Sequence, residues 1–280
     1  HFTSETVIRG IYQGLNTLGL REGGPLRVLE PSAGIGNFMG LMPEGYNAQF
    51  LAVELDPTTA AIGRYLYPHS WHINNGFQNA ELKDACFDLV VGNPPFGKQT
   101  LYDPNFPELR NFSIHNYFLA KSLSLLRPGG IGAFVVSRFF MDAADPAARE
   151  HIAEYADLLG AVRLPETAFR QNALTDVTTD ILFFRKHDGP RIRSTDWTQT
   201  ATIEALDTKE GGTRPAVINK YFAELPGQII GNMVYSGGMF QDALNCVAPS
   251  DIDLGAEISK RVQVLPPMQY VPRTESAEEA

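Results

Sequence analysis

The chain has 280 residues, 44% of them hydrophobic, which is enough for one large domain or two small ones with a buried core. Its 32 acidic and 23 basic residues give a net charge of −9, which argues against strong nucleic-acid binding by this chain alone, because phosphate contacts need a basic surface. Two cysteines, Cys86 and Cys246, exclude a disulfide framework and favour a reducing, cytoplasmic setting. No stretch reaches membrane-spanning length, and a first residue of His indicates a fragment or a processed chain.

Apolar residues along the first two thirds of the chain alternate between helical and strand-like spacing. Helical spacing predicts helices over 5–18, 115–126 and 145–159, and a further helix that begins at Asp56-Pro57. Short apolar runs predict strands at 26–29, 50–53, 71–73, 89–91, 131–136, 161–164 and 180–184. Strands that alternate with helices indicate an α/β fold, a doubly wound Rossmann-like sheet of about seven strands over residues 1–187. The last two strands lie too close in sequence for a helical crossover, which predicts an antiparallel hairpin at one edge.

The alternating pattern weakens beyond residue 187. Residues 188–265 are expected to form a C-terminal extension of unclear role, with a polar linker and at most one strand before residue 215. A capping box from Ser250 to Asp253 predicts a short helix that ends near residue 264. Residues 266–280 end in an acidic run and are expected to be a disordered tail.

A turn with two glycines follows the first expected strand. Gly34 and Gly36 allow the backbone to pass close to a ligand, and the helix that follows offers its N–H groups. Gly40 comes one residue late for the Gly-x-Gly-x-x-Gly dinucleotide fingerprint, which disfavours NAD. Glu30 stands where it can pair with an ammonium group, and it would repel a pyrophosphate. The turn therefore favours S-adenosylmethionine as the cofactor.

Glu54 ends the second expected strand and comes just before a helix start. A carboxylate at this place can accept hydrogen bonds from two ribose hydroxyls, a role that serves NAD and S-adenosylmethionine equally well. The alternative is an acid that only stabilises the N-terminus of the next helix.

The tetrapeptide Asn93-Pro94-Pro95-Phe96 closes the buried strand expected at 89–91. Ligands of open α/β sheets bind beyond the carboxyl ends of the strands. A rigid Asn-Pro-Pro turn there cannot continue as a strand and points its carbonyls outward. It can hold an amine by hydrogen bonds while an aromatic ring stacks on the planar group that carries the amine. An ordinary strand-ending turn is the alternative.

Taken together and in this order, these motifs resemble those of the S-adenosylmethionine-dependent N6-adenine DNA methyltransferases that carry the cofactor motif first. The resemblance covers about residues 1–187. Residues 30–38 fit the motif (Asp/Glu)-Pro-x-x-Gly-x-Gly-x-Phe, and Asn93 to Phe96 match the catalytic tetrapeptide of that family. It implies catalytic roles for Asn93, Pro94, Pro95 and Phe96. It implies cofactor-binding roles for Phe2, Thr3, Glu30, Pro31, Ala33, Gly34, Gly36, Phe38, Glu54, Leu55, Phe77 and Asn93, and it implies no metal.

The chain departs from the family pattern in two places. The family often has an acidic residue after the third strand for the cofactor adenine, whereas residues 74–78 here contain none, so that Phe77 is left to stack on the ring. The residues after 186 are few for a target-recognition domain. Residues 163–169 and 178–180 also resemble the methylase modules of large phage- or plasmid-borne helicase–methylase proteins, which implies that parts engaging DNA lie outside this chain, in a larger multidomain protein.

The implied reaction is methyl transfer to the N6 amine of an adenine in DNA. The side-chain oxygen of Asn93 and the carbonyl of Pro94 would accept the two amine hydrogens, and Phe96 would stack on an adenine flipped out of the helix. Lys98 and Arg110, in the polar-aromatic loop that follows, are expected to bind substrate phosphates, unless the loop is a plain surface connection. His115 is expected to be a cap or packing residue rather than a base.

Two other functions share these motifs. Methyltransferases that act on RNA bases or on a protein glutamine amide use a similar Asn-Pro-Pro-aromatic turn for a similar planar amine. A non-catalytic, cofactor-binding module of a larger DNA-processing protein would explain the low basicity of the chain.

Overall fold

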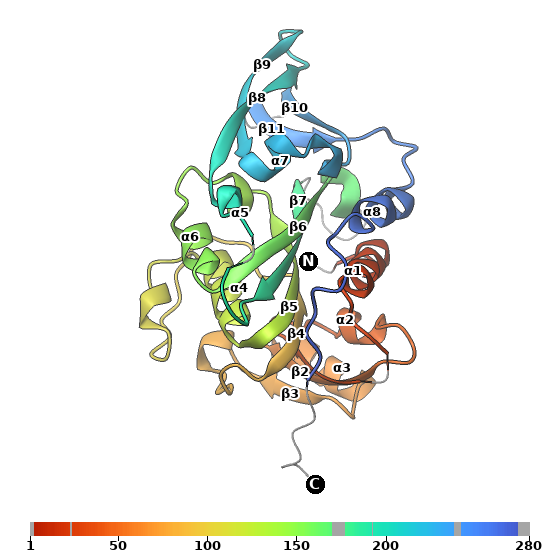
Figure 1. Cartoon of the computed structure of the whole chain (residues 1–280), viewed down its shortest axis with the longest axis vertical. Helices are drawn as coiled ribbons and strands as arrows, with labels where there is room; N and C mark the ends of the chain where they lie inside the picture. The colour runs from red at the N-terminus through yellow and green to blue at the C-terminus, as the bar shows by residue number, and fades with distance from the viewer. Residues whose placement is uncertain (1–2, 23, 170–176, 192, 238–241, 274–280) are drawn as a thin grey trace.

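The computed structural model describes residues 3–22, 24–169, 177–191, 193–237 and 242–273. Its larger sheet has seven strands in the order β3-β2-β1-β4-β5-β7-β6 (Figure 1). These strands are β1 (Pro25–Glu30), β2 (Asn47–Glu54), β3 (Trp71–Asn74), β4 (Phe87–Gly92), β5 (Leu126–Ser137), β6 (Ala156–Leu164) and β7 (Thr179–Lys186). The first five run parallel, and β7 is antiparallel to both β5 and β6. The predicted sheet and its antiparallel edge hairpin are therefore confirmed.

Helices cover both faces of this sheet because its central strands are apolar on both sides. Every residue of β4 is buried. The helices are α1 (Glu5–Thr17), α2 (Asn37–Gly40), α3 (Pro57–Leu66), α4 (Ile114–Ser124), α5 (Phe139–Asp142), α6 (Ala147–Ala153), α7 (Lys220–Glu224) and α8 (Leu254–Val262). In Figure 1, α1 and α8 lie on the right of the sheet, and α4 and α6 lie on the left.

The α8 helix packs closely on α1, although the two are far apart in the sequence. A Cβ atom on Gly10 would lie only 2.3 Å from Cγ2 of Ile258, so the absence of a side chain at Gly10 sets the approach of the two helices. Asp253 caps α8 by accepting a hydrogen bond from the N–H of Ala256. The helix expected near 250–264 therefore exists, but its N-cap is Asp253 rather than Ser250. It packs beside α1 in the helical layer on one face of the larger sheet.

Residues after 187 form more structure than the sequence predicted. A second sheet has the order β11-β10-β8-β9, and it stands at the top of Figure 1. Its strands are β8 (Thr200–Asp207), β9 (Thr213–Asn219), β10 (Asn232–Gly237) and β11 (Asp242–Val247). The sequence predicted a linker and at most one strand for 188–215, which leaves room for β8, but it did not predict β9, β10 and β11, because the residues after 216 show no clear apolar period.

A buried polar cluster joins the smaller sheet to the larger one. Arg163 on β6 is fully buried and donates hydrogen bonds to Asp180 at 2.8 and 2.9 Å and to Asp142 at 2.9 Å. Asp142 also accepts a hydrogen bond from the N–H of Asn219, the last residue of β9. Each buried charge is thus paired, as burial requires.

Residues 266–273 lie along the larger sheet, where the sequence predicted the start of a disordered tail; the rest of that predicted tail, 274–280, lies outside the described residues. The N–H of Met268 donates to the carbonyl of Thr17, and the N–H of Tyr270 donates to that of Leu18. Arg273 pairs at 3.0 Å with Asp88, which is buried in β4. These contacts were missed because a proline-containing segment has no helical or strand period to read.

Two general features hold for the described part of the chain. None of its helices has the length and apolar character needed to span a bilayer. In the same residues, no three or more His, Cys, Asp or Glu side chains converge in a way that could hold a metal ion.

Candidate active site

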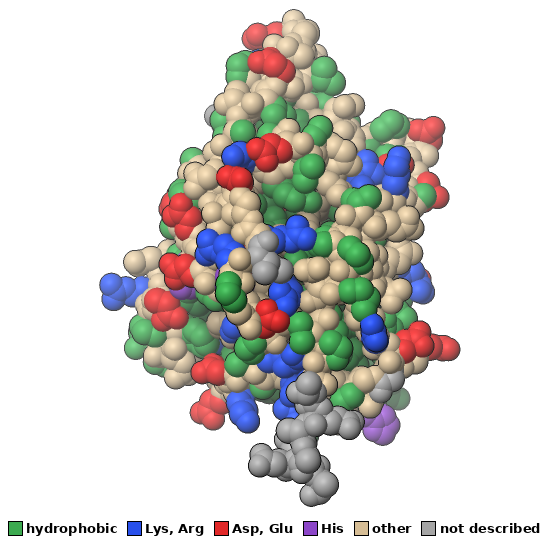
Figure 2. Space-filling model, viewed as in Figure 1, with side chains coloured by type: hydrophobic (Ala, Val, Ile, Leu, Met, Phe, Trp, Pro, Cys, Tyr) green, Lys and Arg blue, Asp and Glu red, His purple; other side chains and the backbone are tan. Residues whose placement is uncertain are grey.

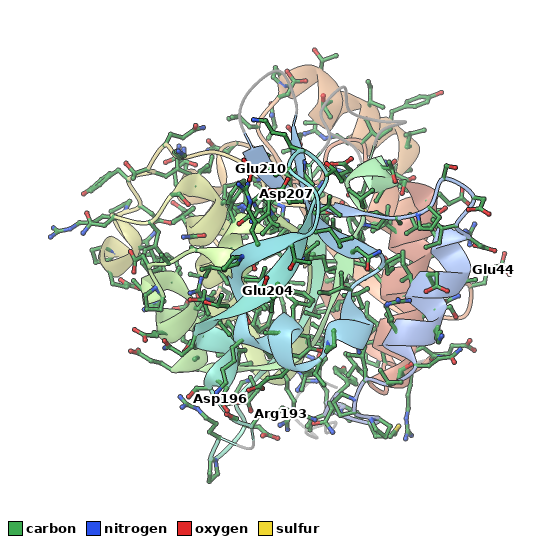
Figure 3. All side chains as sticks on the ribbon, turned by 90° about the horizontal axis from the view of Figure 1, so that it is seen from above. Glu44, Arg193, Asp196, Glu204, Asp207 and Glu210 are labelled. Atoms are coloured by element: carbon green, nitrogen blue, oxygen red, sulfur yellow. The ribbon has the colours of Figure 1, made fainter. Side chains whose placement is uncertain are left out.

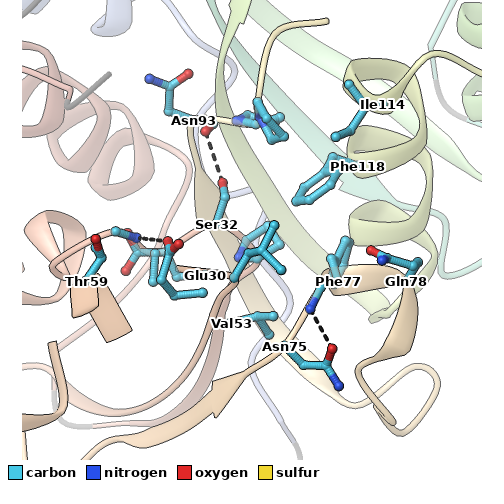
Figure 4. Close-up of a pocket in the computed structure, with 18 of the residues that line it drawn as sticks. Glu30, Ser32, Val53, Thr59, Asn75, Phe77, Gln78, Asn93, Ile114 and Phe118 are labelled. Atoms are coloured by element: carbon cyan, nitrogen blue, oxygen red, sulfur yellow. Dashed lines mark hydrogen bonds between the residues drawn. The ribbon is translucent and has the colours of Figure 1, made fainter. Parts of the chain in front are cut away.

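A cavity of about 550 Å³ opens at the carboxyl ends of β1, β2 and β4 (Figure 4). The ends of several parallel strands meet here, which is where open α/β sheets bind their ligands. The lining residues come from the ends of β1 and β2, from the segments after β1, β2, β3 and β4, from α4, and from Thr3 near the N-terminus. They are Thr3, Glu30, Pro31, Ser32, Ala33, Gly34, Asn37, Phe38, Val53, Glu54, Leu55, Thr59, Asn75, Gly76, Phe77, Gln78, Asn93, Pro94, Pro95, Phe96, Gln99, Leu101, Ile114 and Phe118.

The cavity brings together most of the residues that the sequence singled out. All four residues of the tetrapeptide line it, with Thr3, Glu30, Pro31, Ala33, Gly34, Phe38, Glu54, Leu55 and Phe77. Phe2 lies outside the described residues. Gly36 is set back from the wall: it is the left-handed residue, with φ of 88°, that starts α2, and the ring of Tyr67 covers its α-carbon.

Glu54 connects the glycine turn to the loop after β2. One of its carboxylate oxygens accepts from the N–H of Gly34 and the other from the N–H of Asp56, both at 2.8 Å. A carboxylate has about four acceptor positions, so each oxygen can still accept a further hydrogen bond. The two backbone contacts hold the carboxylate in one orientation at the cavity wall, which suits the binding of a ribose diol.

Glu30 is a buried acid that faces this cavity with one oxygen atom free. Its side chain is 2% exposed, and Oε2 has no hydrogen-bond partner among the described residues. Burial and the nearby charge of Glu54 raise the pKa of Glu30 well above its usual value, and a hydrogen bond from the N–H of Phe38 opposes part of this rise. A cation that entered the cavity would satisfy Oε2. The cavity therefore fits S-adenosylmethionine, whose ammonium would pair with Glu30 while its ribose reaches Glu54.

The loop after β3 supplies amide groups where the sequence showed no acid. The N–H of Gly76 donates to Oδ1 of Asn75 at 2.8 Å. The side-chain amide of Gln78 occupies the space that a side chain at residue 76 would take, since a Cβ on Gly76 would lie 2.5 Å from its Nε2. An amide both donates and accepts, so Gln78 can meet the edge of an adenine ring.

Phe77 lies mostly in the core. It is 1% exposed, its ring packs against Phe118 with centroids 4.9 Å apart, and the Nζ of Lys121 lies 4.6 Å from its centroid. Stacking of Phe77 on the cofactor adenine stays a prediction.

The tetrapeptide Asn93 to Phe96 is tied to the glycine turn. The hydroxyl of Ser32 donates to the carbonyl of Asn93 at 3.0 Å, as the dashed line in Figure 4 marks. Among the residues that the structure describes, the side-chain amide of Asn93 has no hydrogen-bond partner, so it is available to a ligand. The hydrogen bond between Ser32 and Asn93 holds the glycine turn, where the cofactor is predicted to bind, next to the tetrapeptide, where the acceptor is predicted to bind.

The loop that follows the tetrapeptide is anchored at several points. The N–H of Ile114 donates to the carbonyl of Gln99 at 2.6 Å. Asp103 is 2% exposed, and it accepts hydrogen bonds from the buried Lys121 at 2.8 Å and from the hydroxyl of Tyr117 at 2.5 Å. The ends of this loop therefore hold a fixed place beside the cavity.

The two basic residues predicted to bind substrate lie elsewhere on this loop. Lys98 and Arg110 are both exposed and neither lines the cavity. Their predicted role at phosphates remains a proposal, since a phosphate backbone would lie outside the cavity in any case.

Several lining residues were missed by sequence reasoning. Gln99, Leu101, Ile114 and Phe118 come from the long loop and from α4, and the buried Asp103–Lys121 pair joins this loop to α4. The sequence contained the Asp and the Lys, but nothing in the spacing of 103 and 121 indicated that they meet.

Charges of both signs are mixed on the surface. Figure 2 shows acidic side chains interspersed with basic ones on the face viewed in Figure 1. Seen from above in Figure 3, Glu204 on β8 and Glu210 in the turn to β9 lie over the smaller sheet, and both are exposed.

Part of the chain is similar to known methyltransferases. Residues 59–167, which include the tetrapeptide, match the Eco57I restriction-modification methylase family. The chain is 26% identical over 175 residues to the type II methyltransferase M.XamI of Xanthomonas campestris pv. amaranthicola. This match covers 55% of this chain and 33% of the relative. It is 30% identical over 128 residues to the type II methyltransferase M.TthHB8I of Thermus thermophilus, which covers 39% and 29%. The chain thus spans about a third of the length of the curated relatives it matches.

Solved structures give the same fold. The methyltransferase subunit of the type I restriction-modification system of Streptococcus thermophilus superposes with a TM-score of 0.58 at 12% identity, over 92% of this chain and 51% of that one. The fold is that of the class I S-adenosylmethionine-dependent methyltransferases. These findings confirm the predicted resemblance, the predicted fold and S-adenosylmethionine as the cofactor that the cavity fits.

Proposed function

We propose that this chain transfers a methyl group from S-adenosylmethionine to the N6 amine of an adenine flipped out of DNA. The observation that carries the proposal is that Asn93 and Phe96 line the same cavity as Glu30 and Glu54. A cofactor bound at Glu30 and Glu54 and an acceptor base bound at Asn93 and Phe96 would therefore lie in the same cavity. The type II methyltransferases and the restriction-modification methylase family that this chain matches support DNA as the substrate.

In this mechanism the chain acts mainly by positioning, because the adenine amine is a weak nucleophile whose lone pair is delocalised into the ring. Bound S-adenosylmethionine supplies an electrophilic methyl group. Asn93 accepts one amine hydrogen through its side-chain oxygen, and the carbonyl of Pro94 accepts the other, which favours a pyramidal nitrogen. Phe96, which is 39% exposed, offers a ring face to the flipped base. No strong base is required: transfer would break the sulfonium–methyl bond and leave S-adenosylhomocysteine, and the amine proton, which becomes acidic once the methyl group arrives, would pass to water.

DNA would be held in part by segments outside this chain. The net charge of −9 and the carboxylates over the smaller sheet provide little attraction for phosphates. Lys98 and Arg110, both exposed on the loop after the catalytic turn, would meet the backbone beside the flipped base. The chain would then be the methylase part of a larger protein or assembly.

Methyl transfer with labelled S-adenosylmethionine tests this function. The wild-type chain and Asn93→Ala are each offered unmethylated DNA, RNA and a protein pool, and cofactor binding is measured by calorimetry. We expect label in DNA adenine for the wild type, and none for Asn93→Ala although this variant keeps nearly all of its cofactor affinity. Label in RNA or in protein glutamine would support the rival enzymes, and binding without transfer to any pool would support a non-catalytic module.

A further inference from the structure

Three aromatic rings are stacked from the catalytic turn into the core. The ring of Phe96 and the imidazole of His115 have centroids 5.1 Å apart, with planes at 14°, and His115 and Phe140 follow at 6.5 Å and 23°. The exposed fraction falls from 39% at Phe96 to 5% at His115 and 3% at Phe140. His115 therefore covers one face of the Phe96 ring, and Phe96 is still partly exposed and lines the cavity.

Both residues behind Phe96 are held in place. His115 is the second residue of α4, whose first turn is capped by Ser113 and whose first N–H, from Ile114, bonds to the carbonyl of Gln99. Phe140 lies in α5, and its carbonyl accepts a hydrogen bond from the buried Arg149 at 2.8 Å. The imidazole is thus fixed between a helix start and a buried ring, so it provides a rigid support.

The chemistry of His115 indicates a support and not a base. Burial lowers the pKa of His115 to about 4, so the ring is neutral at neutral pH. Its Nε2 has no hydrogen-bond partner among the described residues, and His115 does not line the cavity that these residues form. Burying a polar atom without a partner is unfavourable, and an aliphatic side chain would avoid it. What the imidazole adds over an aliphatic side chain is a flat face parallel to Phe96.

We propose that His115 is a positioning residue that fixes the plane of the Phe96 ring, so that the free face of this ring receives the flipped base at a constant angle to Asn93. The proposal rests on the proposed function, since it presumes a planar acceptor. Without a flat neighbour the Phe96 ring would be free to rock and flip. The base stacked on it would then move, and with it the acceptor nitrogen, relative to the side-chain amide of Asn93.

Two substitutions of similar volume separate a flat support from plain packing. His115→Phe keeps an aromatic face and removes both ring nitrogens, whereas His115→Leu fills the space without such a face. We expect His115→Phe to keep kcat/KM for the methyl acceptor within about 2-fold, and His115→Leu to lower it by about 2- to 10-fold, the range expected for losing one aromatic pair. The affinity for S-adenosylhomocysteine, measured by calorimetry, should be the same in all three proteins.

A double-mutant cycle tests whether His115 acts through Phe96. In a Phe96→Leu background, His115→Leu should cause no further loss of kcat/KM, because there is no ring left to align. Equal losses in both backgrounds, full activity of His115→Leu, or a loss in His115→Phe as large as in His115→Leu would each overturn the proposal.

A test without turnover separates this proposal from the proposed function. The chain has six histidines, so the ring-proton resonance of His115 can be assigned by its disappearance in His115→Phe. Phe96→Leu should shift this resonance, since it removes the ring current of the stacked neighbour, and an unchanged resonance would refute the stack. If no pool is methylated while the shift occurs, the proposed function fails and the stack stands.

Discussion

Glu30→Gln should have opposite effects on cofactor binding and on stability. The substitution keeps the size of the side chain and removes a buried acid whose Oε2 has no partner among the described residues. The pKa of Glu30 is raised by burial and by the charge of Glu54, so the folded chain resists the ionised form. That ionised form is the one that a cationic ligand needs.

The expected loss of affinity follows from the kind of contact removed. A hydrogen bond to a charged group contributes about 1.5–3 kcal/mol, which corresponds to roughly 10- to 150-fold in Kd. The amide oxygen of Gln can still accept, so we expect the lower end, about 10-fold. Because the raised pKa must be exceeded for Glu30 to ionise, the wild-type affinity should fall as the pH is lowered from neutral to acidic values, whereas the affinity of Glu30→Gln should not.

Stability should change in the other direction. A carboxyl whose folded pKa lies above its unfolded pKa stabilises the fold fully below the unfolded value, and this stabilisation is lost as the pH rises through the folded value. Because Gln cannot ionise, Glu30→Gln does not lose this stabilisation as the pH rises. The ligand-free variant should therefore melt at a higher temperature than the wild type at neutral pH, and the two should converge at acidic pH.

Calorimetry with S-adenosylhomocysteine and thermal unfolding across this pH range measure both effects. Glu44→Gln is the matched control, because Glu44 is exposed and lies outside the cavity (Figure 3). It should leave affinity and melting temperature unchanged. The reasoning would be refuted if Glu30→Gln bound the ligand as tightly as the wild type, or if it lowered the melting temperature at neutral pH.

Two further substitutions test the walls of the cavity. Gln78→Leu should weaken binding of S-adenosylhomocysteine by about 2- to 10-fold, the range for one neutral hydrogen bond, and Gly76→Ala, whose Cβ displaces the Gln78 amide, should weaken it as well. Calorimetry measures both affinities, with Gln13→Leu, at an exposed position, as control. An affinity of Gln78→Leu equal to that of the wild type would exclude a hydrogen bond from the Gln78 amide to the ligand. Lys121→Met leaves Asp103 buried without its ion partner and should cost about 3–5 kcal/mol in urea unfolding, and Lys121→Met combined with Asp103→Leu should recover most of it. A loss below about 1 kcal/mol for Lys121→Met would contradict the anchoring role of this pair.

The parts of the fold that the sequence predicted are those where local signals agree with the tertiary structure. The strand β4 is buried throughout, with a run of apolar residues from Leu89 to Val91, and two prolines follow shortly after it, so its end could be read directly. Asp56 and Pro57 start α3 as their capping chemistry predicts, with Asp56 accepting from the N–H of Thr59. Glu30 and Glu54 were found because each ends a strand at the edge where ligands bind.

The missed parts depend on contacts that no local pattern encodes. The helix expected at 145–159 stops at Ala153, because the chain continues as β6 from Ala156 and pairs with β7. The strand β5 begins at Leu126, five residues before the run that predicted it, since Phe87 pairs with Leu126 across a register shift. His115 was correctly taken as a packing residue, but its stack on Phe96 required two segments to be placed in space.

We propose that this chain methylates adenine in DNA, with the adenine held at the Asn93 turn and the cofactor bound beside it. Sequencing of DNA from cells that lack adenine methylases of their own and express this chain measures this most directly. We predict N6-methyladenine in one flanking sequence context, and its absence from cells that express Asn93→Ala at the same level. DNA free of N6-methyladenine, in cells whose purified wild-type chain binds S-adenosylmethionine, would contradict the claim.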